Sequence, residues 1–277
     1  MTVCIAATVL DEWIIAISDR KVAVDGMSAD CTITKVDPIH QSWCAMVSAD
    51  DITSAVPIWD RVRQKLGFHY QRKEYPPEKT LEEVKDAFVE AYHEERDEAV
   101  ANAILRPHAI THEMLFTSGR KLLGSPIFSD MWGRVERFDL GCSFIVAGFD
   151  KFKRSHVFTI SHPGVYKNFD SIGFWAIGSG SYQALTSMFL IDEKHRPTYE
   201  GLLYEVCAAK FTAETDPHVG KFTTLLVYQS GKDCPEFYGD KEIESIKKQW
   251  EENGRPKRPP SVEEAIKLLK RFPITYK

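Results

Sequence analysis

The chain has 277 residues, and its 35 Lys and Arg residues against 40 Asp and Glu residues give a formal net charge of −5. This mildly acidic balance argues against nucleic-acid binding, which requires clustered basic side chains to neutralise phosphates. Hydrophobic residues make up 43% of the chain, which is typical of a globular protein that buries a core. No apolar run approaches the ~18 residues of a membrane-spanning helix, so neither a membrane nor a nucleic acid is an expected partner.

The amino-terminal residues and the cysteines bear on where the protein works. The apolar run at 3–10 lacks the basic segment and the cleavage site of a secretory signal, so we expect a cytoplasmic protein. The six cysteines form no CxxC pair, which predicts reduced thiols rather than a disulfide framework or a zinc site. They stand at positions 4, 31, 44, 142, 207 and 234. The nine histidines show no metal-ligand spacing, and neither a metal nor another cofactor is expected.

The first fifty residues predict β-strands. Runs rich in Val, Ile, Ala and Thr occupy residues 2–10, 13–18 and 42–48. Because these runs are nearly continuous rather than alternating in hydrophobicity, we expect the strands to be buried on both faces.

Helices are predicted next. One extends from about residue 52 to Leu66 and ends at Gly67. A second begins at Thr80, which has Glu83 three residues later and so matches the pattern of a capping box. Apolar residues within 106–139 predict two shorter helices.

The remaining chain is predicted to contain both strands and helices. Apolar patterns predict strands at 142–149, 156–160, 174–177 and 222–228, and helices at 182–190, 199–212, 241–250 and 261–269. This order is not the strict alternation of a doubly wound fold, and it predicts an α+β fold in which buried antiparallel sheets are covered by helices. We expect one domain at 1–230, with a helical insertion around 106–139, and a helical extension at 231–277.

The motifs of several large enzyme classes are absent. The sequence has no G-x-x-x-x-G-K-[ST] phosphate loop, no H-E-x-x-H metal motif and no G-x-S-x-G nucleophile elbow. What remains is Thr2, which becomes the first residue if Met1 is removed. An α-amino group has a pKa of about 7.7–8, so it can act as the general base for the hydroxyl of the same residue.

Such a nucleophile needs a cation beside it and a carboxylate that holds the cation. Asp19, at the end of the second predicted strand, and Lys35 are the candidates. Each residue also has an ordinary interpretation, since Met-Thr starts are common, Asp19 could be a solvated strand end and Lys35 could be a surface lysine. The combination is therefore more informative than any one of the three residues.

Four segments together resemble the opening of the proteasome β subunits and their bacterial HslV-type relatives. They are Thr2-Val-Cys-Ile-Ala, Ile15-Ala-Ile-Ser-Asp19-Arg-Lys21, Thr34-Lys35-Val36 and Ala45-Met-Val-Ser-Ala49. Further on, Ala176-Ile-Gly-Ser-Gly180 resembles the Gly-Ser-Gly of the same family. The resemblance covers roughly residues 2–66 and 142–228.

The resemblance implies a fold and a set of roles. The fold is the four-layer αββα sandwich of the N-terminal nucleophile (Ntn) hydrolases, in which helices cover two antiparallel sheets. Thr2 would be the nucleophile, and Lys35 stands sixteen residues after Asp19, as the corresponding pair does in the family. Ser179 would lie near the active site, and Lys21 would be the basic residue beside the aspartate.

The sequence departs from the family at two points. The turn that supplies the oxyanion N–H is glycine-rich in the family but not here, and we assign the donor to Ala49 or Ser48. The family also has a later aspartate that precedes Ser-Gly-Gly. Residues 213–220 stand at that place in this chain, and Glu214 or Asp216 could substitute.

The expected function is that of a threonine-type peptidase or amidohydrolase, which cleaves peptide or amide bonds through an acyl-enzyme on Thr2. Two alternatives stay open: a catalytically inactive assembly subunit on the same scaffold, and an amidohydrolase for a small amide. Because members of the family work as rings, a homo-oligomer is expected. Phe174, Trp175 and Tyr182 are candidates for its interface, although a core role is the stronger interpretation.

Overall fold

The computed structural model describes residues 2–24, 27–30, 35–68, 77–190, 198–232 and 235–254, with the main chain alone at 23–24 and 27–30. Met1, the helix predicted at 261–269, and the cysteines at positions 31 and 234 lie outside the described residues.

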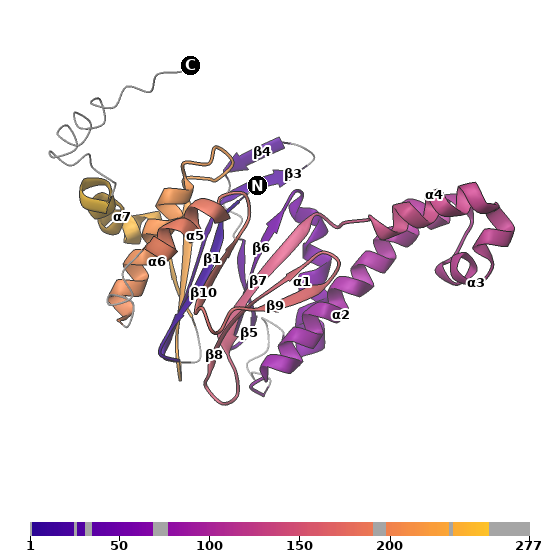
Figure 1. Cartoon of the computed structure of the whole chain (residues 1–277). Helices are drawn as coiled ribbons and strands as arrows, with labels where there is room; N and C mark the ends of the chain where they lie inside the picture. Colours follow the sequence, from indigo (N-terminus) through magenta and orange to yellow (C-terminus); the bar gives the residue numbers. More distant parts are fainter. Residues whose placement is uncertain are drawn as a thin grey trace, which may run out of the picture.

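Two antiparallel sheets form the centre of the molecule (Figure 1). The first has the strand order β10-β1-β2-β11-β12, with β10 (Phe174–Ile177), β1 (Cys4–Val9), β2 (Trp13–Asp19), β11 (Thr223–Gln229) and β12 (Glu236–Tyr238). The second has the order β5-β6-β7-β8-β9, with β5 (Val36–His40), β6 (Trp43–Ala49), β7 (Cys142–Phe149), β8 (Ser155–Ser161) and β9 (Val165–Asn168). A separate hairpin consists of β3 (Lys21–Val24) and β4 (Met27–Asp30).

Strand β1 shows how the sheets and helices are layered. Ile5, Ala7 and Val9 belong to the apolar cluster between the first sheet and its helices. Cys4 and Ala6 belong instead to the cluster between the two sheets. The strand is therefore buried on both faces, as its continuous apolar sequence predicts.

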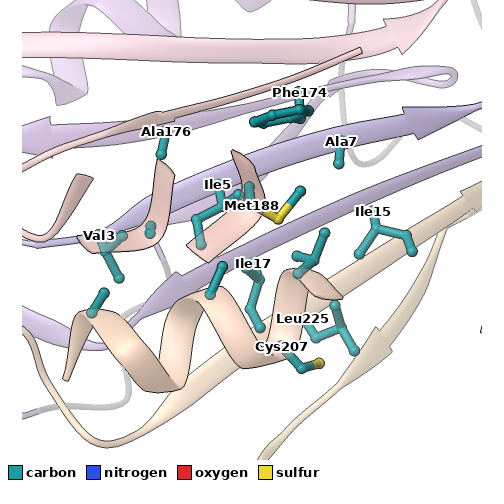
Figure 2. Close-up of a cluster of buried hydrophobic side chains, with 14 of the residues drawn as sticks. Val3, Ile5, Ala7, Ile15, Ile17, Phe174, Ala176, Met188, Cys207 and Leu225 are labelled. Atoms are coloured by element: carbon teal, nitrogen blue, oxygen red, sulfur yellow. The ribbon is translucent and has the colours of Figure 1, made fainter. Parts of the chain in front are cut away.

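Helices cover the outer face of each sheet. α5 (Ser181–Leu190), α6 (Tyr199–Ala213) and α7 (Asp240–Gln249) pack on the first sheet, and Figure 2 shows part of the cluster that they form with it. α1 (Val56–Leu66) and α2 (Leu81–Val100) pack on the second sheet. The order of layers is thus helices, sheet, sheet, helices, and the predicted α+β sandwich of two antiparallel sheets is confirmed.

A helical arm, defined here as residues 101–139, projects from this body (Figure 1). It contains η2 (Ala101–Leu105), η3 (Arg106–His108), α3 (His112–Leu123) and α4 (Ser125–Glu136), and it has an apolar cluster of its own. Arg96 of α2 donates to the carbonyls of Val135 and Phe138 at 2.7 and 3.1 Å. The end of α4 therefore returns to the helix from which the arm departs.

Local signals account for several element boundaries. Thr80 and Glu83 form the predicted capping box at the start of α2. The helix expected from about residue 52 begins at Val56 instead, because a short turn, η1 (Ile52–Ser54), precedes it. After α7 the chain continues through η5 (Trp250–Gly254). Within the part of the chain that the structure describes, no helix is both long and apolar enough to cross a membrane.

Candidate active site

The register between two neighbouring strands brings two distant parts of the sequence together. β1 and β2 pair with Cys4 opposite Ser18, so the residue before Cys4 lies beside the residue after Ser18. The Val3 N–H accordingly donates to Asp19 Oδ1 at 3.0 Å, and the Asp19 N–H donates to the Val3 carbonyl at 3.2 Å. Lys35 comes from the other sheet, where it immediately precedes β5. The site therefore forms where the two sheets meet.

The side chains of Thr2, Asp19 and Lys35 contact one another. Lys35 Nζ donates to Thr2 Oγ1 and, at 2.9 Å, to Asp19 Oδ1, and the Thr2 hydroxyl donates to the same carboxylate oxygen. The relative exposures of the three residues are 1%, 0% and 3%. The lysine and the carboxylate form a buried ion pair, and both contact the hydroxyl. Such a pairing is required because a charge buried this deeply is tolerated only with a partner.

The turn at residues 178–180 packs against the main chain of Thr2. Thr2 N–H donates to Ser179 Oγ at 3.2 Å, and Gly180 N–H donates to the Thr2 carbonyl at 3.1 Å. Gly178 has φ +97°, and a Cβ on it would overlap the Thr2 carbonyl oxygen. Glycine is therefore required at 178 both by the backbone conformation and by the close approach. The structure brings Ser179 to Thr2, although the two residues are 177 positions apart in the sequence.

The second oxygen of Asp19 is held by main-chain donors. Oδ2 accepts from the N–H of Lys21 at 3.1 Å and from the N–H of Gly220 at 2.8 Å. Lys21 Nζ donates to the Pro217 carbonyl at 2.9 Å. The sequence does not predict the role of Gly220, because a main-chain donor can come from almost any residue type.

The two residues assigned as oxyanion donors lie at the end of β6. Ser48 and Ala49 line a cavity of about 460 Å³, and Gly178 and Ser179 line it as well, so the cavity adjoins the residues that contact Thr2. The rest of its wall consists of Asp50, Asp139, Gly141, Cys142, Ser143, Ser161 and His162. The cavity is large enough to hold a side chain or a small amide next to the turn at residues 178–180, which packs against Thr2.

The two acidic candidates after α6 lie elsewhere. Glu214 accepts from Lys210 Nζ at 2.6 Å and lies 3.3 Å from Lys247 Nζ. Asp216 Oδ1 accepts from the His218 N–H at 2.7 Å. Among the described residues, neither carboxylate has a hydrogen bond to Thr2, Asp19 or Lys35. Glu214 is engaged by lysines of α6 and α7, and Asp216 by the main chain of its own turn. Lys210 is a further buried charge near these carboxylates, and a lysine within the apolar sequence of α6 is a signal from which it could be predicted.

Cys4 is the thiol nearest to the site in sequence, and its environment is unsuited to nucleophilic attack. Burial raises the pKa of Cys4 to about 12, and its Sγ donates to the Val47 carbonyl at 3.4 Å. Cys44, Cys142 and Cys207 are also free and buried, which agrees with the predicted reduced thiols. In the described ranges, no group of three or more His, Cys, Asp or Glu side chains could hold a metal ion.

No protein-family model matches the chain, and no curated protein matches it. A functional interpretation therefore depends on the site itself. Its chemical elements are a buried hydroxyl in contact with an ammonium group and a carboxylate, a main-chain nitrogen of the same threonine beside a serine hydroxyl, and an adjoining cavity.

Proposed function

We propose that this protein is an Ntn hydrolase of the proteasome β-subunit and HslV-like type, which cleaves peptide or amide bonds through an acyl-enzyme on Thr2. The observation that carries the proposal is the contact of one hydroxyl, Thr2 Oγ1, with both the Lys35 ammonium group and the Asp19 carboxylate. The arrangement of two antiparallel sheets between helical layers supports the proposed fold family.

The mechanism requires the removal of Met1, because only a free α-amino group on Thr2 can accept a proton. That amine takes the hydroxyl proton while Oγ1 attacks the carbonyl carbon of the substrate. It then delivers the proton to the leaving nitrogen as the carbon–nitrogen bond breaks and an ester forms on Thr2. A water molecule, deprotonated by the same amine, hydrolyses the ester and restores the threonine.

Electrostatic interactions support two stages of this reaction. The Lys35 ammonium group contacts Oγ1 and stabilises the negative charge that develops there, and Asp19 holds the ammonium group in place by a charge-assisted hydrogen bond. A main-chain N–H at Ala49 or Ser48, on the wall of the adjoining cavity, would receive the oxyanion. Removal of such a donor typically lowers turnover by about 10²–10³.

The alternatives differ in what they require of the site. An inactive assembly subunit would have no need for a buried ion pair on a threonine hydroxyl, so the contacts of Thr2 favour an active protein. An amidohydrolase for a small amide would use the same residues and the same cavity. A peptide-based inhibitor and a small amide are therefore both used in the test.

An epoxyketone tests the nucleophile and the base together, because its ring adduct requires the hydroxyl and the free α-amino group of one residue. Intact-mass analysis should show loss of Met1 and then addition of the mass of a peptide epoxyketone, and peptide mapping should place the adduct on Thr2. Unlabelled protein should hydrolyse peptides or small amides, and the preferred substrate separates the peptidase from the small-amide enzyme.

Two variants complete the experiment. Thr2→Ala should gain no inhibitor mass, whereas Cys4→Ala should be labelled like the wild type because the buried Cys4 thiol is not the nucleophile. Labelling of a cysteine would contradict the threonine mechanism. Protein with a free Thr2 that is neither labelled nor hydrolytic would be an inactive assembly subunit.

A further inference from the structure

Lys210, near the end of α6, is a fully buried lysine that the proposed reaction does not use. Its ammonium group donates to Glu214 Oε1 at 2.6 Å and to the main-chain carbonyl of Lys221 at 2.9 Å. Burial lowers the pKa of Lys210 despite the attraction of Glu214, so it costs free energy to keep a charged ammonium group here. An apolar residue of similar size would fill the space without this penalty, so packing alone does not account for a lysine at this position.

The two partners of Lys210 mark the ends of one segment. Glu214 directly follows α6, and Lys221 lies two residues before β11. A single ammonium group therefore ties together the two ends of residues 214–221, which connect α6 to β11. Because the charge is buried, this tie is shielded from solvent and salt more than a surface ion pair would be.

Residues of this segment contact the Thr2 site at two points. Gly220 N–H donates to Asp19 Oδ2 at 2.8 Å. Val219 packs against Gly180, since a Cβ on Gly180 would lie 2.5 Å from Val219 Cγ2, and the Gly180 N–H donates to the Thr2 carbonyl at 3.1 Å. The segment that Lys210 closes thus lies against both the carboxylate and the turn that contacts the threonine.

The two oxygens of Asp19 have different roles. Oδ1 contacts the Thr2 hydroxyl and the Lys35 ammonium group, while Oδ2 accepts from the N–H groups of Lys21 and Gly220. The donors on Oδ2 fix the rotation of the carboxylate, and this rotation determines where Oδ1 holds its two partners. Loss of the Gly220 donor would leave Lys21 as the remaining main-chain donor to Oδ2 among the described residues.

We propose that Lys210 is a positioning residue: by tying together residues 214–221 it holds the Gly220 N–H on Asp19 and so orients the carboxylate for Thr2 and Lys35. The kinetic consequence of this inference rests on the proposed threonine hydrolase. The structural consequence does not, because the protection of the main-chain donors on Asp19 can be measured whether or not the protein hydrolyses a substrate.

The test compares Lys210→Met with a matched control, Lys247→Met. Lys247 on α7 also lies 3.3 Å from Glu214, but its side chain is 31% exposed. Hydrogen–deuterium exchange of the full chain, resolved by mass spectrometry with fragmentation, reports on the amides of Gly220 and Val3, which donate to Oδ2 and Oδ1 of Asp19. Steady-state kinetics on the same proteins separate kcat from KM.

We expect Lys210→Met to speed exchange of both amides by about 10-fold or more. It should lower kcat by about 10- to 100-fold with KM nearly unchanged, since Lys210 contacts no substrate. Lys247→Met should leave both measurements at their wild-type values. Unchanged exchange at Gly220, or an unchanged kcat in folded Lys210→Met, would overturn the inference.

Two further outcomes are distinguishable. If wild-type protein with a free Thr2 hydrolyses nothing, the proposed function fails, and exchange at Gly220 and Val3 alone decides whether Lys210 positions Asp19. If Lys210→Met does not fold, Glu214→Gln replaces it, because this variant keeps the shape of the side chain and removes the charge that holds Lys210. It should produce a smaller change in the same direction, and the absence of any change would count against the inference.

Discussion

Lys35 is a buried lysine whose ammonium group contacts both the Thr2 hydroxyl and Asp19. Lys35→Met should therefore lower turnover by about 10²-fold or more, because the charge beside the nucleophile is lost. The free energy of unfolding should also fall, by about 3–5 kcal/mol, since the buried Asp19 carboxylate loses its cation. Kinetics and urea unfolding check the two effects. Near-wild-type turnover in a folded Lys35→Met protein would remove Lys35 from the site.

Gly178 and Gly67 form a matched pair for separating steric overlap from backbone strain. Both have positive φ, of +97° and +71°, but a Cβ on Gly178 would overlap the Thr2 carbonyl, whereas a Cβ on Gly67 would meet nothing within 4 Å. Gly67→Ala should therefore lower the free energy of unfolding by about 1 kcal/mol and leave turnover unchanged. Gly178→Ala should lower the free energy of unfolding by roughly 3 kcal/mol or more. It should also displace Ser179 and lower turnover. Equal effects of the two substitutions would show that the contact with Thr2 is unimportant.

His156 on β8 introduces a pH dependence of stability far from the Thr2 site in the sequence. Burial alone would lower the pKa of His156, but the hydrogen bond from Nδ1 to Asp170 at 2.7 Å and the nearby charge of Asp150 outweigh burial and raise the pKa. A raised folded-state pKa contributes stability below the unfolded value of about 6.5, and this contribution is lost as the pH rises through the folded-state pKa.

The contribution of His156 to the free energy of unfolding should therefore decrease as the pH rises above about 6.5. His156→Gln should flatten this decrease, whereas the same substitution at the exposed His108 should not. Urea titrations at several pH values measure the slope. An identical slope in wild type and His156→Gln would mean that His156 carries no net proton uptake on folding.

At the scale of the element, the helical arm is the clearest separable part. Its apolar cluster is distinct from those that join the sheets and the other helices, and Arg96 already brings the end of α4 back to α2. Replacing residues 101–134 by a short Gly/Ser linker should therefore leave a folded body with an epoxyketone-reactive Thr2. Circular dichroism melting and intact-mass labelling check this result. For comparison, Phe88→Ala, in the apolar cluster between the second sheet and its helices, should lower the free energy of unfolding by about 3–5 kcal/mol. Loss of folding in the arm deletion would show that the arm is part of the body.

The elements that sequence patterns predicted are those that bury a continuous or periodic apolar face. β1, β2, β6 and β7 were predicted within a few residues, and so were α5, α6 and the start of α2. The strands β5, β9 and β12 were missed because they are short and carry polar residues, as Asp37 and His40 in β5 and Lys167 and Asn168 in β9 show. Their pairing with a neighbouring strand, rather than their composition, makes them strands.

The side chains of the site were more predictable than its main chain. Thr2, Asp19 and Lys35 were proposed from their residue types together with the resemblance, and Ser179 from the resemblance alone. The structure places the side chains of the first three in mutual contact, and it places Ser179 Oγ beside the main-chain nitrogen of Thr2. The N–H of Gly220 was not proposed, because its role depends on the path of residues 214–221 and not on its side chain. The two acidic candidates in that segment, Glu214 and Asp216, are held by other groups, namely Lys210 and the N–H of His218.

At the scale of the whole molecule, the proposed homo-oligomer can be tested on one exposed aromatic side chain. Of the three candidates, Phe174 is buried, whereas Tyr182 on α5 is 85% exposed. Light scattering at micromolar concentration should report a multiple of the monomer mass, and Tyr182→Glu should reduce it if α5 lies in the interface. Phe189→Ser, on the same helix, is a second variant for this test, because the Phe189 side chain is 56% exposed. A monomeric wild type would contradict a ring.

The position of the site between the two sheets has a consequence for the life of the chain. Thr2 precedes β1 and Asp19 ends β2 of the first sheet, while Lys35 precedes the first strand of the second. Small residues such as Ala6, Ala16 and Ala147 lie between the two inner faces. A nascent or damaged molecule whose sheets have not docked would keep its threonine apart from its lysine. Such a chain would lack the lysine beside its threonine, so docking of the two sheets, in addition to removal of Met1, would be required before the proposed hydrolase could act.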